Sequence, residues 1–132
     1  MSEMAATWKA KLQPLAGARW PLRCGFVIPP DDLERLQAGL WPRDMDDRWA
    51  IWLDGNTLRC WRSWATTCIY EARLDLNPDG SATAVMLDVL DDPETYVRAT
   101  SEEAELQRFE GVLALIRQVR GEVGALTRLP VA

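Results

Sequence analysis

The end of one predicted strand brings together side chains that could bind an anion beside an aromatic ring. Arg62, Ser63 and Trp64 are consecutive, and Thr66 follows two positions later. A guanidinium offers a planar fork of N–H donors, hydroxyl groups add further donors, and an indole offers a flat face for stacking. This set predicts a small-ligand site for a phosphate or carboxylate, such as that of a nucleotide.

Arg62 also has a purely structural interpretation. On an alternating strand it shares a face with Leu58 and Cys60, and a guanidinium on an apolar face needs a carboxylate or a bound anion. Glu71 and Asp88, on neighbouring predicted strands, are the carboxylates that we expect it to contact. Both interpretations, an internal ion pair and a ligand-binding residue, stay open at this point.

Tryptophan is concentrated in the middle of the chain. Five of the seven tryptophans lie between positions 41 and 64: Trp41, Trp49, Trp52, Trp61 and Trp64. Side chains three positions apart on a strand point to opposite faces, so we expect tryptophan on both faces of a sheet. Indole rings favour interfaces because they bury a large area and keep a polar N–H. Unless helices cover both faces, we predict a binding surface that includes Trp41, Trp52, Arg59 and Trp61.

Aspartates gather in two predicted loops. Asp44, Asp46 and Asp47 precede the strands of the middle region, and Asp91 and Asp92 follow them. If the loops met, their oxygens could hold Mg²⁺ or Ca²⁺, which gives a metal-assisted hydrolase as one hypothesis. The spacing fits no calcium-binding loop, and no lysine or histidine lies nearby to complete a nuclease-like site. We therefore expect that these aspartates bind no metal. We expect them to be solvated and to form a docking surface for a basic partner.

The sequence excludes most common catalytic machinery. It has no histidine, which excludes Ser-His-Asp and Cys-His catalysis and nearly all usual zinc sites. Neither glycine-rich phosphate-binding pattern, GxxxxGK[ST] or GxGxxG, occurs in it. We predict no catalytic residue, no cofactor and no enzyme activity.

The candidate residues fall on a region of strands. Residues 48–53, 58–64, 68–76 and 82–90 alternate or run apolar, and turn sequences at 54–56 and 77–80 separate them. This pattern predicts a four-stranded antiparallel meander over about 48–90, with Glu71, Arg73 and Asp75 on one face of the third strand. The apolar run at 24–28 is expected to form an edge strand or an extended lead-in.

Helices are predicted on both sides of this region in the sequence. A short helix is expected at 3–12. Prolines and aspartates at 29–32 precede Leu33, Leu36 and Leu40 at helical spacing, and Pro42 would end that helix near Trp41. The most regular helix is predicted over about 101–120. It has a capping box at Thr100 and Glu103, an apolar stripe, and a C-cap at Gly121; the stripe is Leu106, Phe109, Leu113 and Ile116.

The chain as a whole is predicted to be one α+β domain, residues 1–132, with helices packed on one face of the sheet. Its length of 132 residues suits a single domain. A formal net charge of −5 argues against nucleic acid or an anionic membrane as partner. Three cysteines without a C-x-x-C pair, no signal-peptide pattern and no membrane-length apolar run predict a cytoplasmic protein.

The middle of the chain resembles a core found in small uncharacterised bacterial proteins. The similar pieces are R-S-W-A-T at 62–66, I-Y-E at 69–71 and D-P-E-T-Y at 92–96, within roughly residues 48–96. The chain departs from the pattern at 65–66, where threonine and then a small residue are expected. The resemblance implies an immunity or accessory protein of a bacterial toxin or defence system, and it implies no catalytic residue.

Three hypotheses of function follow. The first is a non-enzymatic protein-binding domain whose acidic loops attract a basic partner. The second is a small-ligand domain that holds a nucleotide or another anion at Arg62, Ser63 and Trp64. The third is the metal-assisted hydrolase built on the loop aspartates. The sequence does not determine the oligomeric state.

Overall fold

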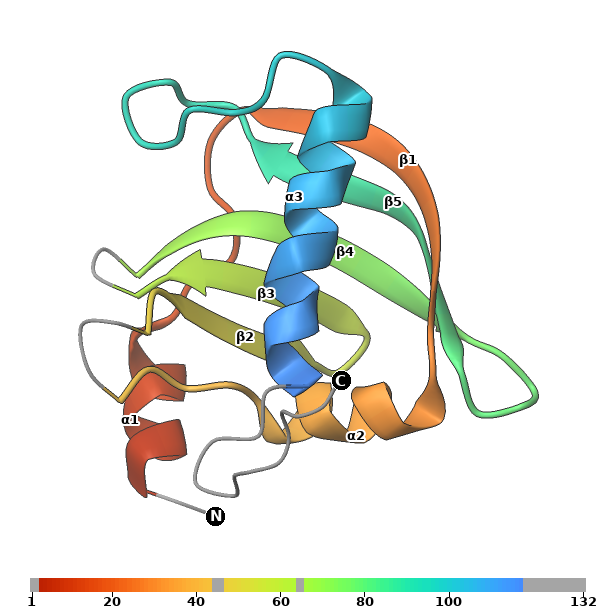
Figure 1. Cartoon of the computed structure of the whole chain (residues 1–132). Coiled ribbons are helices and arrows are strands. Elements are labelled where there is room, and N and C mark those ends of the chain that lie inside the picture. The colour runs from red at the N-terminus through yellow and green to blue at the C-terminus, as the bar shows by residue number, and fades with distance from the viewer. Residues whose placement is uncertain (1–2, 44–46, 64–65, 118–132) are drawn as a thin grey trace, which may run out of the picture.

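The computed structural model describes residues 3–43, 47–63 and 66–117. It is an α+β protein, as predicted (Figure 1). The elements in chain order are α1 (Glu3–Lys11), β1 (Arg19–Ile28), α2 (Pro30–Ala38), β2 (Trp49–Asp54), β3 (Thr57–Arg62), β4 (Thr67–Leu76), β5 (Ala82–Leu90), α3 (Glu102–Ala114) and the short 3-10 helix η1 (Leu115–Arg117).

The sheet has five strands in the order β1-β5-β4-β3-β2, and every neighbouring pair is antiparallel. The predicted four-stranded meander is present as β2 to β5, and β1, of which only residues 24–28 were expected as an edge strand or lead-in, adds a fifth strand. β1 pairs with β5 along its length, from Arg19 opposite Leu90 to Ile28 opposite Ala82. Pro21 is tolerated because β1 is an edge strand, and Gly25, with φ of +60°, lies at a bulge.

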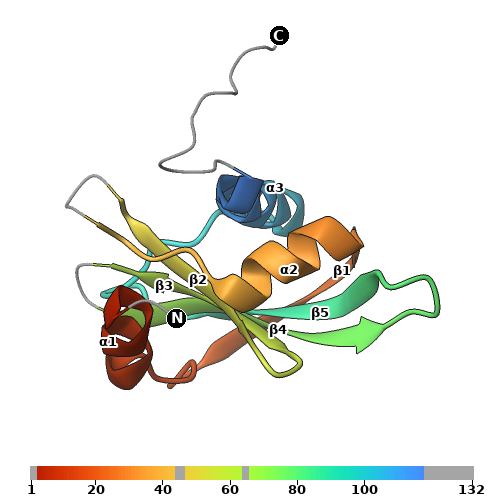
Figure 2. The same ribbon diagram turned by 90° about the horizontal axis from the view of Figure 1, so that it is seen from below.

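Helices lie on both faces of the sheet, which corrects the prediction of helices on one face. α2 and α3 cover one face, and α1 lies against the other (Figure 2). Two tryptophans of the sheet contact α1 and the segment after it. The Trp61 indole donates to the backbone carbonyl of Gln13 at 2.7 Å, and the Lys9 ammonium lies 4.4 Å from the centre of the Trp52 ring. α1 is short, so it covers only the end of this face near β2 and β3.

α2 ends earlier than predicted, at Ala38. Gly39 follows with φ of +91°, and a Cβ there would lie only 2.3 Å from Cζ2 of the Trp41 ring. Only glycine therefore allows both the backbone turn and the close approach of the indole. Leu40 leaves the helix and pairs with Ile51 of β2 through two backbone hydrogen bonds of 2.8 and 3.0 Å, so its predicted helical role is wrong.

α3 confirms the predicted C-terminal helix, but its N-cap is one residue later than the predicted Thr100, so the predicted capping box of Thr100 and Glu103 is wrong. Ser101 is the N-cap, and its side chain accepts a hydrogen bond from the Ala104 amide at 3.1 Å. Phe109 is fully buried against Tyr70 of β4, with ring centres 5.1 Å apart. The stripe continues to Ile116 in η1. Residues 118–120 and the predicted C-cap at 121 lie outside the described residues.

Much of the core fills the space between the sheet and the two helices α2 and α3.

All three cysteines are free thiols; Cys60 and Cys68 are buried, and Cys24 is half-buried. Burial, with the nearby Glu71 carboxylate, raises the pKa of the Cys68 thiol to about 12, so this thiol is poorly reactive. None of the described helices is long and apolar enough to cross a membrane.

Candidate functional site

The predicted tryptophan surface is largely interior. Trp41 is 8% exposed and Trp61 only 2%, so the expectation that these two rings face a partner is wrong. α1 and the segment that follows it lie against these rings, with the Lys9 ammonium 5.9 Å from the centre of the Trp41 ring and the Gln13 carbonyl bonded to Trp61. Each indole N–H has an internal carbonyl partner. Trp52 is half-buried beneath Lys9 and donates to the carbonyl of Gln37 at 3.1 Å. Trp64 lies outside the described residues.

Arg62 faces the α3 side of the sheet and lies among aromatic rings. Its guanidinium carbon is 4.8 Å from the centre of the Trp49 ring and 5.4 Å from that of Tyr96. Cys60, which is on the same face of β3 as Arg62, pairs with Tyr70 of β4. Glu71 is the next residue after Tyr70, so its side chain points to the face opposite that of Arg62. The predicted contact of Arg62 with Glu71 and Asp88 is therefore wrong.

Ser63 and Thr66, which were predicted to act with Arg62, lie in the β3–β4 turn. The Ser63 amide donates to the carbonyl of Arg48 at 2.9 Å, which fixes the end of β3 against the start of β2. Thr66 has φ of +49°, the left-handed conformation that turns require. Both residues have a clear local structural role.

A buried polar network connects α3 to the sheet near Arg62. Glu105 is fully buried, and one of its oxygens accepts hydrogen bonds from the hydroxyls of Tyr70 at 2.6 Å and Tyr96 at 2.5 Å. Its other oxygen accepts from the Ala99 amide at 2.6 Å. Arg108 donates to the Tyr96 hydroxyl at 2.7 Å. Burial and the bond to Glu105 raise the pKa of both tyrosines, so the hydroxyls stay protonated and serve as donors.

The described aspartates of the two loops make local contacts. Asp47 accepts from the Arg43 amide at 3.0 Å, Asp91 lies 3.5 Å from Arg98, and Asp92 accepts from the Thr95 hydroxyl at 2.8 Å. Asp44 and Asp46 lie outside the described residues. Among the residues that the structure does describe, no three histidine, cysteine or acidic side chains are grouped to hold a metal ion.

The half of the sheet that α1 leaves open forms a shallow hollow of about 410 Å³, which we call the sheet groove. Six charged side chains line it in equal numbers of each sign: Arg19, Arg59, Arg73, Glu71, Asp75 and Asp88. Thr57, Val85 and Met86 complete the lining. Val85 and Met86 are 40% and 41% exposed, and they give the groove an apolar contact area.

Ion pairs connect four of these charged side chains, which come from four strands. Glu71 accepts from Arg59 Nε and from Arg19 Nη1, each at 2.6 Å, and Arg19 also bonds Asp88 at 2.8 Å. Burial alone would raise the pKa of Glu71, but the hydrogen bonds from Arg59, Arg19 and the Leu15 amide outweigh burial and lower that pKa. The wall of the groove is therefore an ion-pair lattice in which the charges of these four lining side chains sum to zero.

The lowered pKa of Glu71 predicts a pH-dependent stability. The folded pKa lies below the ordinary value of 4.5, so Glu71 stabilises the native state at neutral pH, and this contribution disappears as the pH falls through the folded pKa. Glu71→Gln should lower the free energy of unfolding at pH 7, and the difference from wild type should shrink below pH 4. Urea denaturation of both proteins from pH 7 to pH 3 measures it. A difference that stays constant over this range would contradict the assignment.

Arg73 and Asp75 occupy the open part of the groove. They lie two positions apart on β4, so they share its outer face, and both are exposed. Within residues 3–43, 47–63 and 66–117, neither side chain has a hydrogen-bond or ion-pair partner. Sequence alternation indicated that Glu71, Arg73 and Asp75 share a face. It did not indicate Arg19 or Met86, because their places depend on the pairing of β1 and β5.

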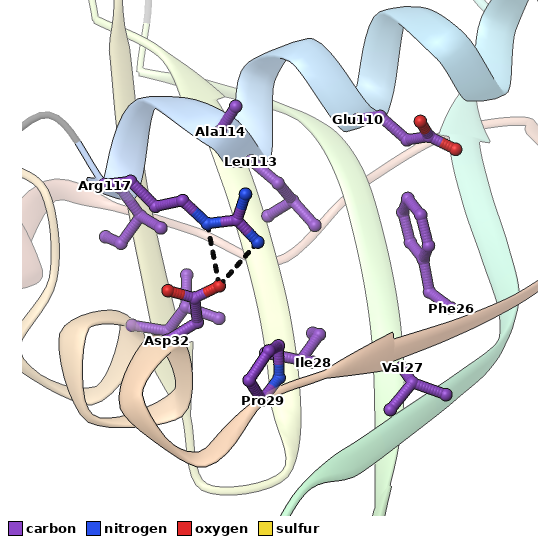
Figure 3. Close-up of a pocket in the computed structure, with 11 residues that line it drawn as sticks. Phe26, Val27, Ile28, Pro29, Asp32, Glu110, Leu113, Ala114 and Arg117 are labelled. Atoms are coloured by element: carbon purple, nitrogen blue, oxygen red, sulfur yellow. Dashed lines mark hydrogen bonds and ion pairs between the residues drawn. The ribbon is translucent and has the colours of Figure 1, made fainter. Parts of the chain in front are cut away.

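A second hollow lies on the other side of the molecule, between the end of β1, α2 and α3 with η1 (Figure 3). We call it the interhelix pocket. It has a volume of about 290 Å³ and mostly apolar walls. Asp32 and Arg117 form an ion pair at one end. No sequence pattern had marked it, because its walls come from three separate segments.

Comparison with protein-family models, curated proteins and solved structures finds no match to this chain.

Proposed function

We propose that this chain is a non-enzymatic protein-binding domain and that its partner docks in the sheet groove. The observation that carries this proposal is the open sheet face itself. It combines a preorganised ion-pair lattice, two exposed charges without described partners, and the exposed side chains of Val85 and Met86. Mixed charge around an exposed apolar patch is typical of a protein interface.

Charge complementarity defines the partner. The chain carries a net charge of −5, which attracts a basic protein over long range. At the contact itself, Arg73 would receive a carboxylate and Asp75 a lysine or arginine of the partner. An apolar side chain would cover Val85 and Met86. Phosphate backbones fit this surface poorly, because the groove holds as many carboxylates as arginines.

The finer proposal follows the sequence resemblance. We propose a cytoplasmic bacterial immunity or accessory role, in which the basic partner is a toxin component. The free thiols at Cys24, Cys60 and Cys68 suit a reducing compartment. If so, co-expression of this chain should neutralise the toxicity of the partner, and Arg73→Glu should weaken that neutralisation.

Site-specific crosslinking identifies the partner and tests where it docks. A photoreactive phenylalanine analogue replaces Met86 in the groove, or Gln107 on the exposed side of α3 as the control. After irradiation in an extract of the source cells, the Met86 position should capture one partner that the Gln107 position does not. Capture of the same partner at Gln107 alone would place the interface on the helical side and contradict the proposal.

Affinity measurements with that purified partner then test the groove charges. Arg73→Glu should weaken binding about tenfold or more, because it places two carboxylates against each other. Arg48→Glu is the matched control: it makes the same change of charge at an exposed arginine outside the groove lining. It should weaken binding much less. Equal effects of the two variants would mean that only net charge matters, which would contradict docking at the groove.

A further inference from the structure

The interhelix pocket has the size and walls of a small-molecule site. Phe26 and Ile28 of β1, Leu36 of α2 and Leu113 of α3 line its volume of about 290 Å³. This volume is close to the lower end, roughly 300 Å³, of sites that hold small ligands. Phe26 is held in place by the buried Phe109, with ring centres 5.5 Å apart. The apolar walls offer water few hydrogen-bond partners, so they favour an apolar occupant.

One end of the pocket carries a cluster of one carboxylate and two arginines. Asp32 is only 7% exposed, and one of its oxygens accepts from both Nε and Nη2 of Arg117, at 2.9 and 2.8 Å. Its other oxygen accepts from Arg35 at 2.9 Å. The three groups together carry a charge of +1; Asp32 and Arg117 line the pocket, and Arg35 lies behind Asp32 outside the lining. Asp32 therefore holds the Arg117 guanidinium in place but does not neutralise the charge of the two arginines.

Arg117 keeps donors for a ligand. Its Nη1 makes no hydrogen bond or ion pair with any residue that the structure describes, and its side chain is 63% exposed. Figure 3 shows the guanidinium above Asp32, facing the hollow from the η1 side. The same view places Glu110 at the far end, beside Phe26. A second anionic group at that end would be repelled by Glu110, so the charge pattern selects a ligand with a single anionic group.

We infer that the interhelix pocket binds a small apolar monocarboxylate. Its carboxylate bonds the Arg117 guanidinium, and its hydrocarbon part packs between Phe26, Leu36 and Leu113. A guanidinium recognises a carboxylate through paired N–H donors, which gives the head group its specificity. This site is on the helical side of the sheet and is independent of docking in the sheet groove.

Calorimetric titration of the full chain with octanoate tests the inference, with octanol and octylamine as probes of equal chain length. Octanoate should bind with one-to-one stoichiometry and at least about tenfold more tightly than either of the other two. Arg117→Gln should weaken octanoate binding about tenfold but leave octanol binding unchanged, because only the carboxylate uses the guanidinium.

A second variant keeps the test decisive if Arg117→Gln fails to fold. Ala114 is exposed and lines the pocket, so Ala114→Trp should fill the hollow and abolish octanoate binding without disturbing the core. Thermal melting of each variant checks the fold. Saturable octanoate binding that both substitutions reduce would support the inference. Absence of saturable binding, equal affinity for octanol or octylamine, or unchanged binding in Ala114→Trp would overturn it.

Discussion

Glu105→Ala is expected to lower the free energy of unfolding by about 3–5 kcal/mol, the usual cost of removing one member of a buried charged network. The glutamate is fully buried, and its two oxygens accept three hydrogen bonds from Tyr70, Tyr96 and the Ala99 amide. Its removal leaves the Ala99 amide and at least one of the two hydroxyls without their acceptor, because the hydroxyls, 3.0 Å apart, share a single hydrogen bond with each other, and it opens a cavity. Since small domains have roughly 5–15 kcal/mol of stability in total, this loss is a large fraction of the stability of the fold.

The matched control is Glu103→Ala, two positions earlier on α3. Glu103 is exposed, so its removal should change the free energy of unfolding by no more than about 0.5 kcal/mol. Urea denaturation, with the midpoint and slope compared among wild type and both variants, measures the effect. If Glu105→Ala costs no more than Glu103→Ala, the network does not hold α3 against the sheet as the structure indicates.

Trp61→Ala is expected to destabilise the fold by about 3–5 kcal/mol, the usual range for an aromatic residue removed from a core. Trp61 is 2% exposed, and its indole donates to the carbonyl of Gln13 at 2.7 Å. The substitution would remove one anchor between the sheet and the segment that follows α1. Hydrogen exchange should show the amides of α1 losing protection before those of β4.

Trp61→Phe separates the packing contribution from the hydrogen bond. Phenylalanine keeps much of the buried ring but leaves the Gln13 carbonyl without its donor, so we expect a smaller loss of about 1–3 kcal/mol. A fully stable Trp61→Ala would show that α1 is held by other contacts. Because Trp61 is a core residue, lost binding in Trp61→Ala would report unfolding and not a missing partner contact.

The strands of the meander could be predicted from sequence because their signals are local. Alternation and turn residues fixed β2 to β5, and the bounds of β5 agree at both ends. β1 was recognised only in its last part, because Pro21 indicates a break in a strand. What makes residues 19–28 a strand is pairing with β5, more than fifty residues later in the chain. A local pattern does not contain that information.

The candidate sites, too, could be predicted only where the sequence signal is local. Alternation along β4 predicted that Glu71, Arg73 and Asp75 share one face, and it predicted opposite faces for Trp49 and Trp52. It could not predict which face a helix covers, so Trp61 was expected at the surface although α1 buries it. The partners of Glu71 were also beyond local reasoning. Arg19 comes from β1, whose position depends on long-range pairing.

The most direct test of docking in the sheet groove is an amide chemical-shift map of the labelled protein with its partner. We expect the largest changes at Thr57 and Arg59 of β3, at Arg73 of β4 and at Val85 and Met86 of β5, which together line the groove. The amides of α2 and α3 should change little. Changes concentrated on α2 and α3, with the groove amides unmoved, would contradict the proposed function.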